Sequence, residues 1–222
     1  VRPASPIPYV NQKGVIERDF TPKESYYVFQ SYWTKKPMLH IYGHSWPVRW
    51  GNDGDEKEIL VYSNCSKVEL FVKGIHQRDS QDFPAAGLRW NVKLKNGLNT
   101  LRAVTVDTKE LLTDELTFEY QTEKWGKATA FQVKATPLKS GIIKVEAQLV
   151  DDKGIRCLDS REFIYFDIAG DGKLIQNQGT VTGSRKIQAR NGRAQILVQT
   201  HQGTSCVAVK ANNVQTSFIT VK

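Results

Sequence analysis

Residues 25–51, SYYVFQSYWTKKPMLHIYGHSWPVRWG, hold three of the five Trp and two of the four His of the chain. Apolar residues at Tyr27, Val28, Tyr32 and Trp33 follow a spacing that is typical of one helix face. From residue 38 onward the apolar period changes to two, which predicts strands. We therefore expect one helix, followed by a chain that is β-strands and turns to its end.

The predicted helix covers residues 22–34. Thr21 is placed to cap it, Pro22 suits the first helical position, and Glu24 completes a capping box. Lys35 and Lys36 then add positive charge near the negative end of the helix, and a proline follows. A short helix with an aromatic face must bury that face on the following domain or on something outside this chain.

A first series of strands is predicted over residues 37–121, with short turns between them. Residues 88–94, LRWNVKL, alternate so that Leu88, Trp90, Val92 and Leu94 share one face. The other predicted strands are residues 38–42, 59–62, 68–72, 100–106 and 116–120. Short strands at this close spacing favour an antiparallel β-sandwich.

A second series of strands follows a linker that starts at residue 122. Its predicted strands are residues 130–135, 142–150, 163–168, 193–199, 205–210 and 217–221. Residues 122–222 have the usual size of an immunoglobulin-like sandwich, about 100 residues. The predicted fold class is therefore all-β, with two immunoglobulin-like antiparallel β-sandwiches in tandem, preceded by one short helix. Residues 1–36 form the segment before the first sandwich.

Composition limits the possible partners. The chain has 222 residues, a net charge of +8 and a pI of about 9.3. Its basic residues form no run and accompany no nucleic-acid motif, so we expect no nucleic-acid partner. No apolar run approaches the roughly 20 residues of a membrane span. The chain begins at Val1 without a signal-peptide pattern, and we expect a mature or cut piece.

The three cysteines are Cys65, Cys157 and Cys206. Their spacing does not match a zinc site. We expect buried free thiols, with a Cys157–Cys206 bridge as the open alternative.

No catalytic residue and no cofactor is predicted. Hydrolysis of a glycosidic bond needs two carboxylates that flank it, about 5–10 Å apart. The adjacent pairs Asp114-Glu115 and Asp151-Asp152 fall at expected turns, and neighbouring strand residues point to opposite faces. We interpret them as solvated turn carboxylates.

His40 and His44 are four residues apart and would share one face of a strand. Such a pair could bind a metal ion, but no Asp, Glu or Cys lies close to it in the sequence. We expect hydrogen-bonded structural histidines and no metal site.

The remaining candidate site residues are Trp46, Trp50, Trp90 and His44. Flat aromatic rings stack on the apolar faces of sugars, and residues 46–50 are expected to form a loop that could display them. They are candidates for contact with carbohydrate or for docking of a neighbouring domain. The alternative is that the rings cover the core.

Residues 13–50, KGVIERDFTPKESYYVFQSYWTKKPMLHIYGHSWPVRW, resemble the junction after the catalytic barrel of family 2 glycoside hydrolases, the β-galactosidase and β-glucuronidase group. Residues 61–74, VYSNCSKVELFVKG, are similar to the strand–turn–strand that follows in that family. The motifs GDGKLIQNQG and NGRAQILV, within residues 170–198, resemble its terminal immunoglobulin-like domain. The resemblance covers most of the chain.

This resemblance implies that the helix is left from a (β/α)8 barrel, which itself needs about 250 residues. The family's acid/base Glu follows an Asn, and the sequence has no Asn-Glu dipeptide. No catalytic residue is therefore carried over. The resemblance also implies a bacterial parent that is periplasmic or secreted.

The sequence thus predicts the non-catalytic C-terminal β-sandwich region of a β-galactosidase-like glycoside hydrolase fragment, active in carbohydrate metabolism. Its expected partner is the catalytic barrel of the parent chain, with polysaccharide or oligosaccharide as a further partner. The alternative is a pair of carbohydrate-binding modules that use exposed Trp residues.

Overall fold

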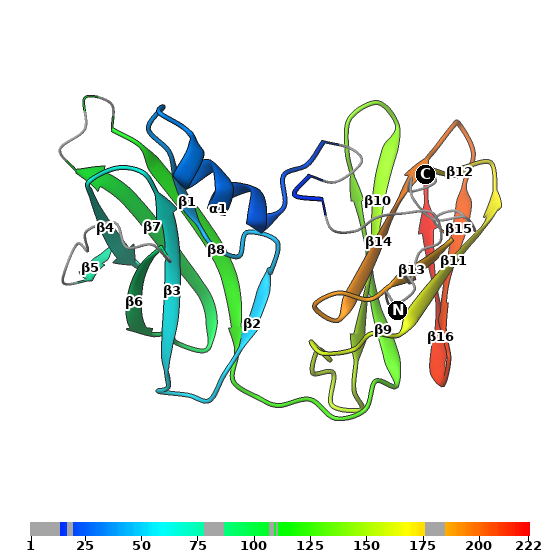
Figure 1. Ribbon diagram of the computed structural model, residues 1–222. Coiled ribbons are helices and arrows are strands. Elements are labelled where there is room, and N and C mark those ends of the chain that lie inside the picture. The colour runs from blue at the N-terminus through cyan, green and yellow to red at the C-terminus, as the bar shows by residue number, and fades with distance from the viewer. Residues whose placement is uncertain (1–13, 17–19, 78–86, 107–108, 110, 176–184) are drawn as a thin grey trace, which may run out of the picture. The chain divides into compact units, whose positions relative to one another are not determined.

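The computed structural model describes residues 14–16, 20–77, 87–106, 109, 111–175 and 185–222. The chain divides into two compact units, one of Gly14–Glu123 and one that contains Lys124–Lys222 (Figure 1). The strand pairs of both units are antiparallel apart from that of β2 (Val48–Trp50) with β8 (Thr113–Gln121) in the first unit, and the single helix of the described residues also belongs to the first unit. The predicted all-β class with tandem sandwiches is confirmed. The domain boundaries after residues 36 and 121 stay predictions.

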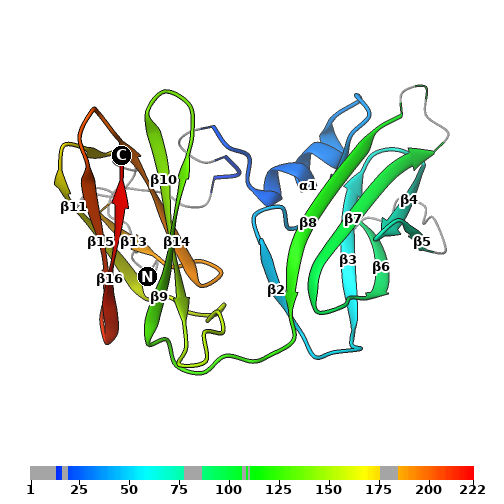
Figure 2. The same ribbon diagram turned by 180° about the vertical axis from the view of Figure 1, so that it is seen from behind.

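The first unit packs two sheets face to face, which Figures 1 and 2 show from opposite sides. One sheet has the order β1-β3-β6 and the other the order β2-β8-β7-β4-β5. The elements are α1 (Glu24–Trp33), β1 (Leu39–Ile41), β2 (Val48–Trp50), β3 (Glu56–Ser63), β4 (Lys67–Val72), β5 (Ile75–Gln77), β6 (Leu88–Lys93), β7 (Gly97–Val106) and β8 (Thr113–Gln121).

Alternation along the strands builds the core of this unit. In β6 the side chains of Leu88, Trp90 and Val92 are buried, whereas those between them are exposed. Phe118 and Tyr120 of β8 pack into the same core from the opposite sheet. The predicted common face of residues 88–94 is confirmed, because Leu94 is also buried.

The second unit is a sandwich of two four-stranded sheets, ordered β12-β14-β10-β9 and β13-β11-β15-β16. Its core includes Phe131, Leu149, Ile164 and Phe166. The elements are β9 (Ala130–Pro137), β10 (Ile142–Val150), β11 (Phe163–Gly170), β12 (Lys173–Ile175), β13 (Lys186–Gln188), β14 (Arg193–Gln199), β15 (Ser205–Ala211) and β16 (Val214–Val221).

Four strands of three residues each were not predicted, namely β2, β5, β12 and β13. Each lies at the edge of its sheet, where backbone pairing to one neighbour suffices. Three residues are too short for alternation to be recognised. The loop expected at residues 46–50 is therefore wrong for Val48–Trp50, which pairs in parallel with β8.

The start of α1 also differs from the prediction. The helix begins at Glu24, its N-cap residue is Lys23, and no side chain caps it. The expected capping box is wrong, because the Glu24 carboxylate accepts hydrogen bonds from His40 and Ser45 instead. At the other end, the Asn64 side-chain amide donates to the carbonyl groups of Thr34 and Lys36.

All three cysteines are free thiols. Cys65 and Cys157 are buried as expected, and burial raises the pKa of Cys157 to about 11. Cys206 is exposed on β15, so the prediction of burial is wrong for this residue. The alternative Cys157–Cys206 bridge is not formed.

Replacing Trp90 by Ala tests this core. Trp90 is 4% exposed, whereas Trp50 of the same unit is 37% exposed. We expect Trp90→Ala to lower the free energy of unfolding by about 3–5 kcal/mol, since it leaves a large cavity. Urea unfolding followed by circular dichroism measures the change. Trp50→Ala is the control, with an expected loss of less than about 1 kcal/mol; equal losses would contradict the assignment of Trp90 to the core.

Candidate functional site

A polar contact joins the first turn of α1 to β1. The Glu24 carboxylate accepts a hydrogen bond from His40 Nε2 over 3.0 Å and from the Ser45 amide over 3.3 Å. The ring of Tyr27 stacks on the His40 imidazole, with centroids 3.5 Å apart and planes 9° from parallel. His40 is buried, so this contact fixes both the position and the plane of its ring.

The turn after β1 brings the second histidine back over the first. Gly43 has a φ of +100°, and a Cβ there would collide with the Arg49 guanidinium. The imidazoles of His40 and His44 stack with centroids 4.9 Å apart. The two histidines do lie on one side, but a tight turn rather than a continued strand places them there.

Asp114 at the start of β8 completes this group. Its Oδ2 accepts from the Ile41 amide at 2.6 Å and lies 2.9 Å from His44 Nε2 and 4.0 Å from His40 Nδ1. The interpretation of Asp114 as a solvated turn carboxylate is wrong, because it is a half-buried strand residue. We call Glu24, His40, His44 and Asp114 the histidine cluster.

The sequence missed the acidic members of this cluster. Asp114 is 70 residues from His44, and Glu24 is 16 residues from His40, so neither is a sequence neighbour. No carboxylate lies near the two histidines in the sequence, but two carboxylates contact them in the folded chain. No local signal could have located Asp114, since β1 and β8 meet only through the fold.

The electrostatics of the cluster favour an ionised Glu24. Burial by itself would raise the pKa of this carboxyl. The hydrogen bonds from His40 and from the backbone amides of Gly43 and Ser45 outweigh that effect and hold the pKa at about 2.

Arg49 stabilises the turn that follows β1. Its guanidinium donates to the Tyr42 carbonyl over 2.9 Å and lies over the Phe118 ring, 4.3 Å from the centroid. Burial lowers the pKa of Arg49. Trp46 packs edge-on against Tyr42, with centroids 5.2 Å apart. The half-buried Arg49 guanidinium therefore supports the turn that presents Trp46.

The three Trp candidates differ in their exposure to solvent. Trp46 is 43% exposed and Trp50 37% exposed, so both offer surface to a partner. Trp90 is a core residue, and the expectation that it could contact carbohydrate or dock a domain is wrong. The alternation of residues 88–94 had already placed Trp90 on the inner face.

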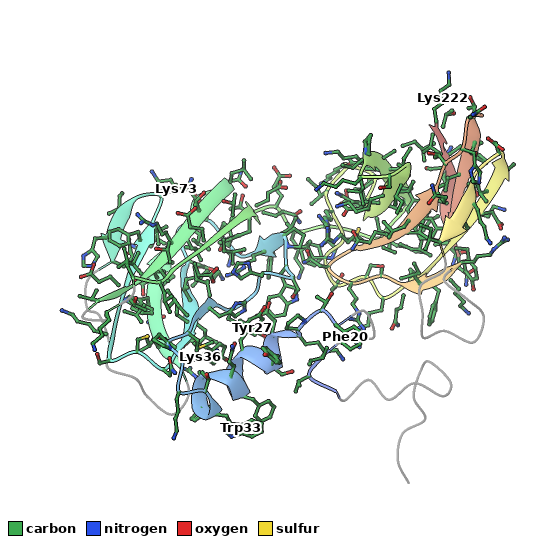
Figure 3. All side chains as sticks on the ribbon, turned by 90° about the horizontal axis from the view of Figure 1, so that it is seen from above. Phe20, Tyr27, Trp33, Lys36, Lys73 and Lys222 are labelled. Atoms are coloured by element: carbon green, nitrogen blue, oxygen red, sulfur yellow. The ribbon has the colours of Figure 1, made fainter. Side chains whose placement is uncertain are left out.

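The helix presents large aromatic side chains to solvent. Their exposed fractions are 42% for Phe29, 47% for Tyr32 and 78% for Trp33, and Phe20, which precedes the helix, is 85% exposed. The rings of Phe29 and Trp33 stack on each other, 4.9 Å apart. Figure 3 shows Trp33 projecting away from the strands, whereas Tyr27 lies on the side of the helix that faces them. We call Phe29, Tyr32 and Trp33 the exposed aromatic face.

The carboxylate pairs have separate structural partners. Glu115 points away from Asp114 and lies 3.4 Å from Arg102. Asp151 is buried and accepts from the amides of Gly126, Lys153 and Ile155, which lowers its pKa. The interpretation of Asp151 as solvated is wrong, because its oxygens hold the turn together from inside.

Among the described residues, no helix is both long and apolar enough to cross a membrane.

Comparison with known proteins defines the class. Residues 54–112, which run from just before β3 to just before β8, match the family model "Domain of unknown function (DUF4982)". The homologues of the chain are β-glucuronidases and β-galactosidases of glycoside hydrolase family 2. The chain spans about a quarter of the length of the relatives that it matches, so it corresponds to a part of these enzymes.

The individual relatives are bacterial. A putative β-glucuronidase of Formosa agariphila is 44% identical over 205 residues, which are 90% of this chain and 25% of the relative. The crystal structure of Parabacteroides merdae β-glucuronidase is 59% identical with a TM-score of 0.89, over 97% of this chain and 28% of that one. Bacteroides uniformis β-glucuronidase 3 is 55% identical with a TM-score of 0.88, over the same shares.

Replacing Glu24 by Gln tests the polar contact between α1 and β1. The pKa of Glu24 is lower in the folded chain than its usual 4.5, so its ionised form stabilises the fold above pH 4.5 and this contribution disappears as the pH falls toward 2. We expect Glu24→Gln to lower the free energy of unfolding by about 2 kcal/mol at pH 7 and by much less at pH 2.5. Urea unfolding at both pH values measures this.

The control for this prediction is Glu119→Gln, which changes an exposed carboxylate of β8. It should leave the free energy of unfolding nearly unchanged at either pH. A Glu24→Gln loss that is the same at pH 7 and pH 2.5 would show that the ionised carboxylate is not what stabilises the contact.

Proposed function

We propose that the chain is the non-catalytic β-sandwich region of a family 2 glycoside hydrolase, and that it supports the catalytic barrel of its parent. The observation that carries this proposal is the exposed aromatic face beside α1. The match to about a quarter of each relative supports a parent with further domains.

The exposed aromatic face has the character of a docking surface. Large contiguous apolar surfaces on soluble domains usually mark an interface, and aromatic residues are enriched among the residues that dominate binding energy. Phe29 and Trp33 stack on each other and present their rings to solvent together. The proposed occupant is the barrel of the same parent, because the resemblance to family 2 glycoside hydrolases implies that this helix is the last one of that barrel. Trp46 and Trp50 would extend the contact.

The parent is proposed to be a β-glucuronidase rather than a β-galactosidase. The solved structures with TM-scores of 0.88–0.89 and 55–59% identity are named β-glucuronidases. The β-galactosidase BoGH2A of Bacteroides ovatus is 27% identical, over 84% of this chain and 22% of that protein. A periplasmic or secreted location of the parent stays a proposal from the resemblance alone.

Binding between this chain and the separately produced catalytic part of its parent tests the docking proposal. We expect Trp33→Ala to raise the dissociation constant roughly 30-fold, which is a loss of about 2 kcal/mol in binding free energy, because a central aromatic anchor is lost. Isothermal titration calorimetry measures the constant.

The matched control is Phe218→Ala, which removes a similarly exposed aromatic residue from β16 of the other unit. It should leave the dissociation constant unchanged. Equal effects of the two substitutions, or no binding by the unsubstituted chain, would contradict docking through α1. Cleavage of aryl β-glucuronides or β-galactosides by this chain alone would contradict its non-catalytic role.

Carbohydrate contact by this chain is the second candidate function. Trp46 and Trp50 are exposed, although Trp90 is excluded from any platform. Residues 124–222 account for the whole net charge of +8, because Asp and Glu concentrate in the first unit while Lys and Arg are evenly divided. The net positive charge of the chain favours an anionic glycan over a neutral one at long range, and Trp46 and Trp50 of the first unit would make the ring contacts.

Affinity electrophoresis through gels that contain anionic or neutral polysaccharides tests this second function. We expect retardation by a uronate-containing polysaccharide that weakens in Trp46→Ala and Trp50→Ala. Leu98→Ala, at an exposed apolar site on β7, is the control. If every gel leaves the mobility unchanged, the glycan-binding function is wrong and the Trp residues are left to domain docking.

A further inference from the structure

The histidine cluster contains a set of metal-ligand atoms that its hydrogen bonds do not fully use. One ligand atom each from His40, His44 and Asp114 lies within 4.8 Å of the other two. They come from β1, from the turn after it and from β8, so the fold and not the sequence assembles them. This observation concerns residues of this chain alone and does not depend on the proposed function.

The orientation of His40 leaves one nitrogen available. Its Nε2 lies 3.0 Å from Glu24 Oε2, and a carboxylate oxygen can only accept, so Nε2 carries the proton. Nδ1 then has a free lone pair, and it lies 4.0 Å from Asp114 Oδ2. A carboxylate that accepts from the outer nitrogen of an imidazole is the usual support for a metal-binding histidine.

The spacing of the atoms suits a small tetrahedral ion. Zinc bonds of about 2.0–2.2 Å put neighbouring tetrahedral ligands about 3.3 Å apart. The distances to Asp114 Oδ2 are 2.9 Å from His44 Nε2 and 4.0 Å from His40 Nδ1, and the ligand atoms of all three residues lie within 4.8 Å of one another. Shifts of at most about 1.5 Å would therefore bring the three atoms to this spacing. Tyr27 fixes the His40 ring and the Ile41 amide fixes the carboxylate, so two of the ligands are already positioned.

We propose that His40 Nδ1, His44 Nε2 and Asp114 form a binding site for a divalent transition metal ion such as Zn²⁺. Two imidazoles and one carboxylate favour zinc and its neighbours over Mg²⁺ or Ca²⁺, which prefer oxygen ligands. His44 gives up its Nε2 proton to solvent or to its own Nδ1 when it binds the ion. His44 is exposed, which provides a path for the ion and leaves a fourth position for water.

The expected role of the ion is structural. It would link β1, the turn that presents Trp46, and β8, and so fix the turn more firmly than the hydrogen bonds alone. The alternative is that the cluster is only a hydrogen-bonded contact between α1 and the sandwich.

The test is a titration of the full 222-residue chain, stripped of metal by a chelator, with Co²⁺ and then Zn²⁺. Cys206 is exposed and its thiolate could bind either ion, so the experiment uses Cys206→Ser as the background. We expect one Co²⁺ per chain with the visible absorption bands of a tetrahedral nitrogen–oxygen site. Zn²⁺ should displace it and raise the melting temperature.

Variants distinguish a built site from adventitious binding. His44→Ala and Asp114→Asn should abolish the tetrahedral Co²⁺ spectrum, and Asp114→Asn keeps an acceptor for the Ile41 amide, so the fold is retained. Glu24→Gln should weaken the affinity roughly 10-fold or more, as loss of an outer carboxylate does. His76→Ala is the matched control, because His76 lies 3.9 Å from Glu69 as an exposed histidine–carboxylate pair on β5 and β4, outside the proposed site.

The proposal is overturned if the chain binds no Co²⁺ or Zn²⁺ in a one-to-one ratio. It is also overturned if binding persists in His44→Ala or is lost equally in His76→Ala. Circular dichroism of each variant establishes that a lost spectrum reflects a lost ligand and not a lost fold.

Discussion

The hydrogen bond between Glu24 and His40 holds the helix to the sandwich. A helix of 10 residues is marginal by itself, and α1 buries only Ser31 completely. Apolar burial is therefore only partial along the helix, and polar contacts add to its attachment. Glu24 anchors its first turn through His40, and Asn64 holds the chain just after its last turn by pairing with Thr34, Lys36 and Met38. Tyr27 adds a stacked ring between these two points.

This mode of attachment has a consequence for the surface. Because polar groups at both ends position the helix, its large aromatic side chains do not need to be buried against the sandwich. Tyr32 and Trp33 belong to the predicted apolar face of the helix and yet remain exposed, and Phe29, which stacks on Trp33, is exposed as well. A periodic apolar pattern identifies a face that becomes buried, but not the partner that buries it. Within the described residues, Tyr27 and Val28 are only partly buried.

The long strands were predictable from the sequence and the polar site was not. Alternation gave the positions of β3, β4, β6, β7, β10, β14 and β15, because each has one face in a core that period-two patterning reports directly. The capping box at Thr21 failed because Glu24 has a better partner in His40, which is a tertiary contact that no local rule includes. The prediction that Asp114 is a solvated turn carboxylate failed for the same reason, because its partner His44 is 70 residues away in the sequence. Side chains whose partners are distant in sequence are the ones that pattern analysis assigns to solvent by default.

The tryptophans show how two rules can conflict within one sequence. The aromatic character of Trp90 suggests a binding residue, yet its place between Leu88 and Val92 in an alternating strand predicts burial. The strand rule should prevail in such a case, because moving one residue of a strand to the other face requires a shift of the whole register. No such strand pattern applies to Trp33, which lies on the helix. Within the described residues no second apolar layer covers its ring, which is 78% exposed. The physical argument for a docking partner therefore lies in α1, where local structure is satisfied and burial is not.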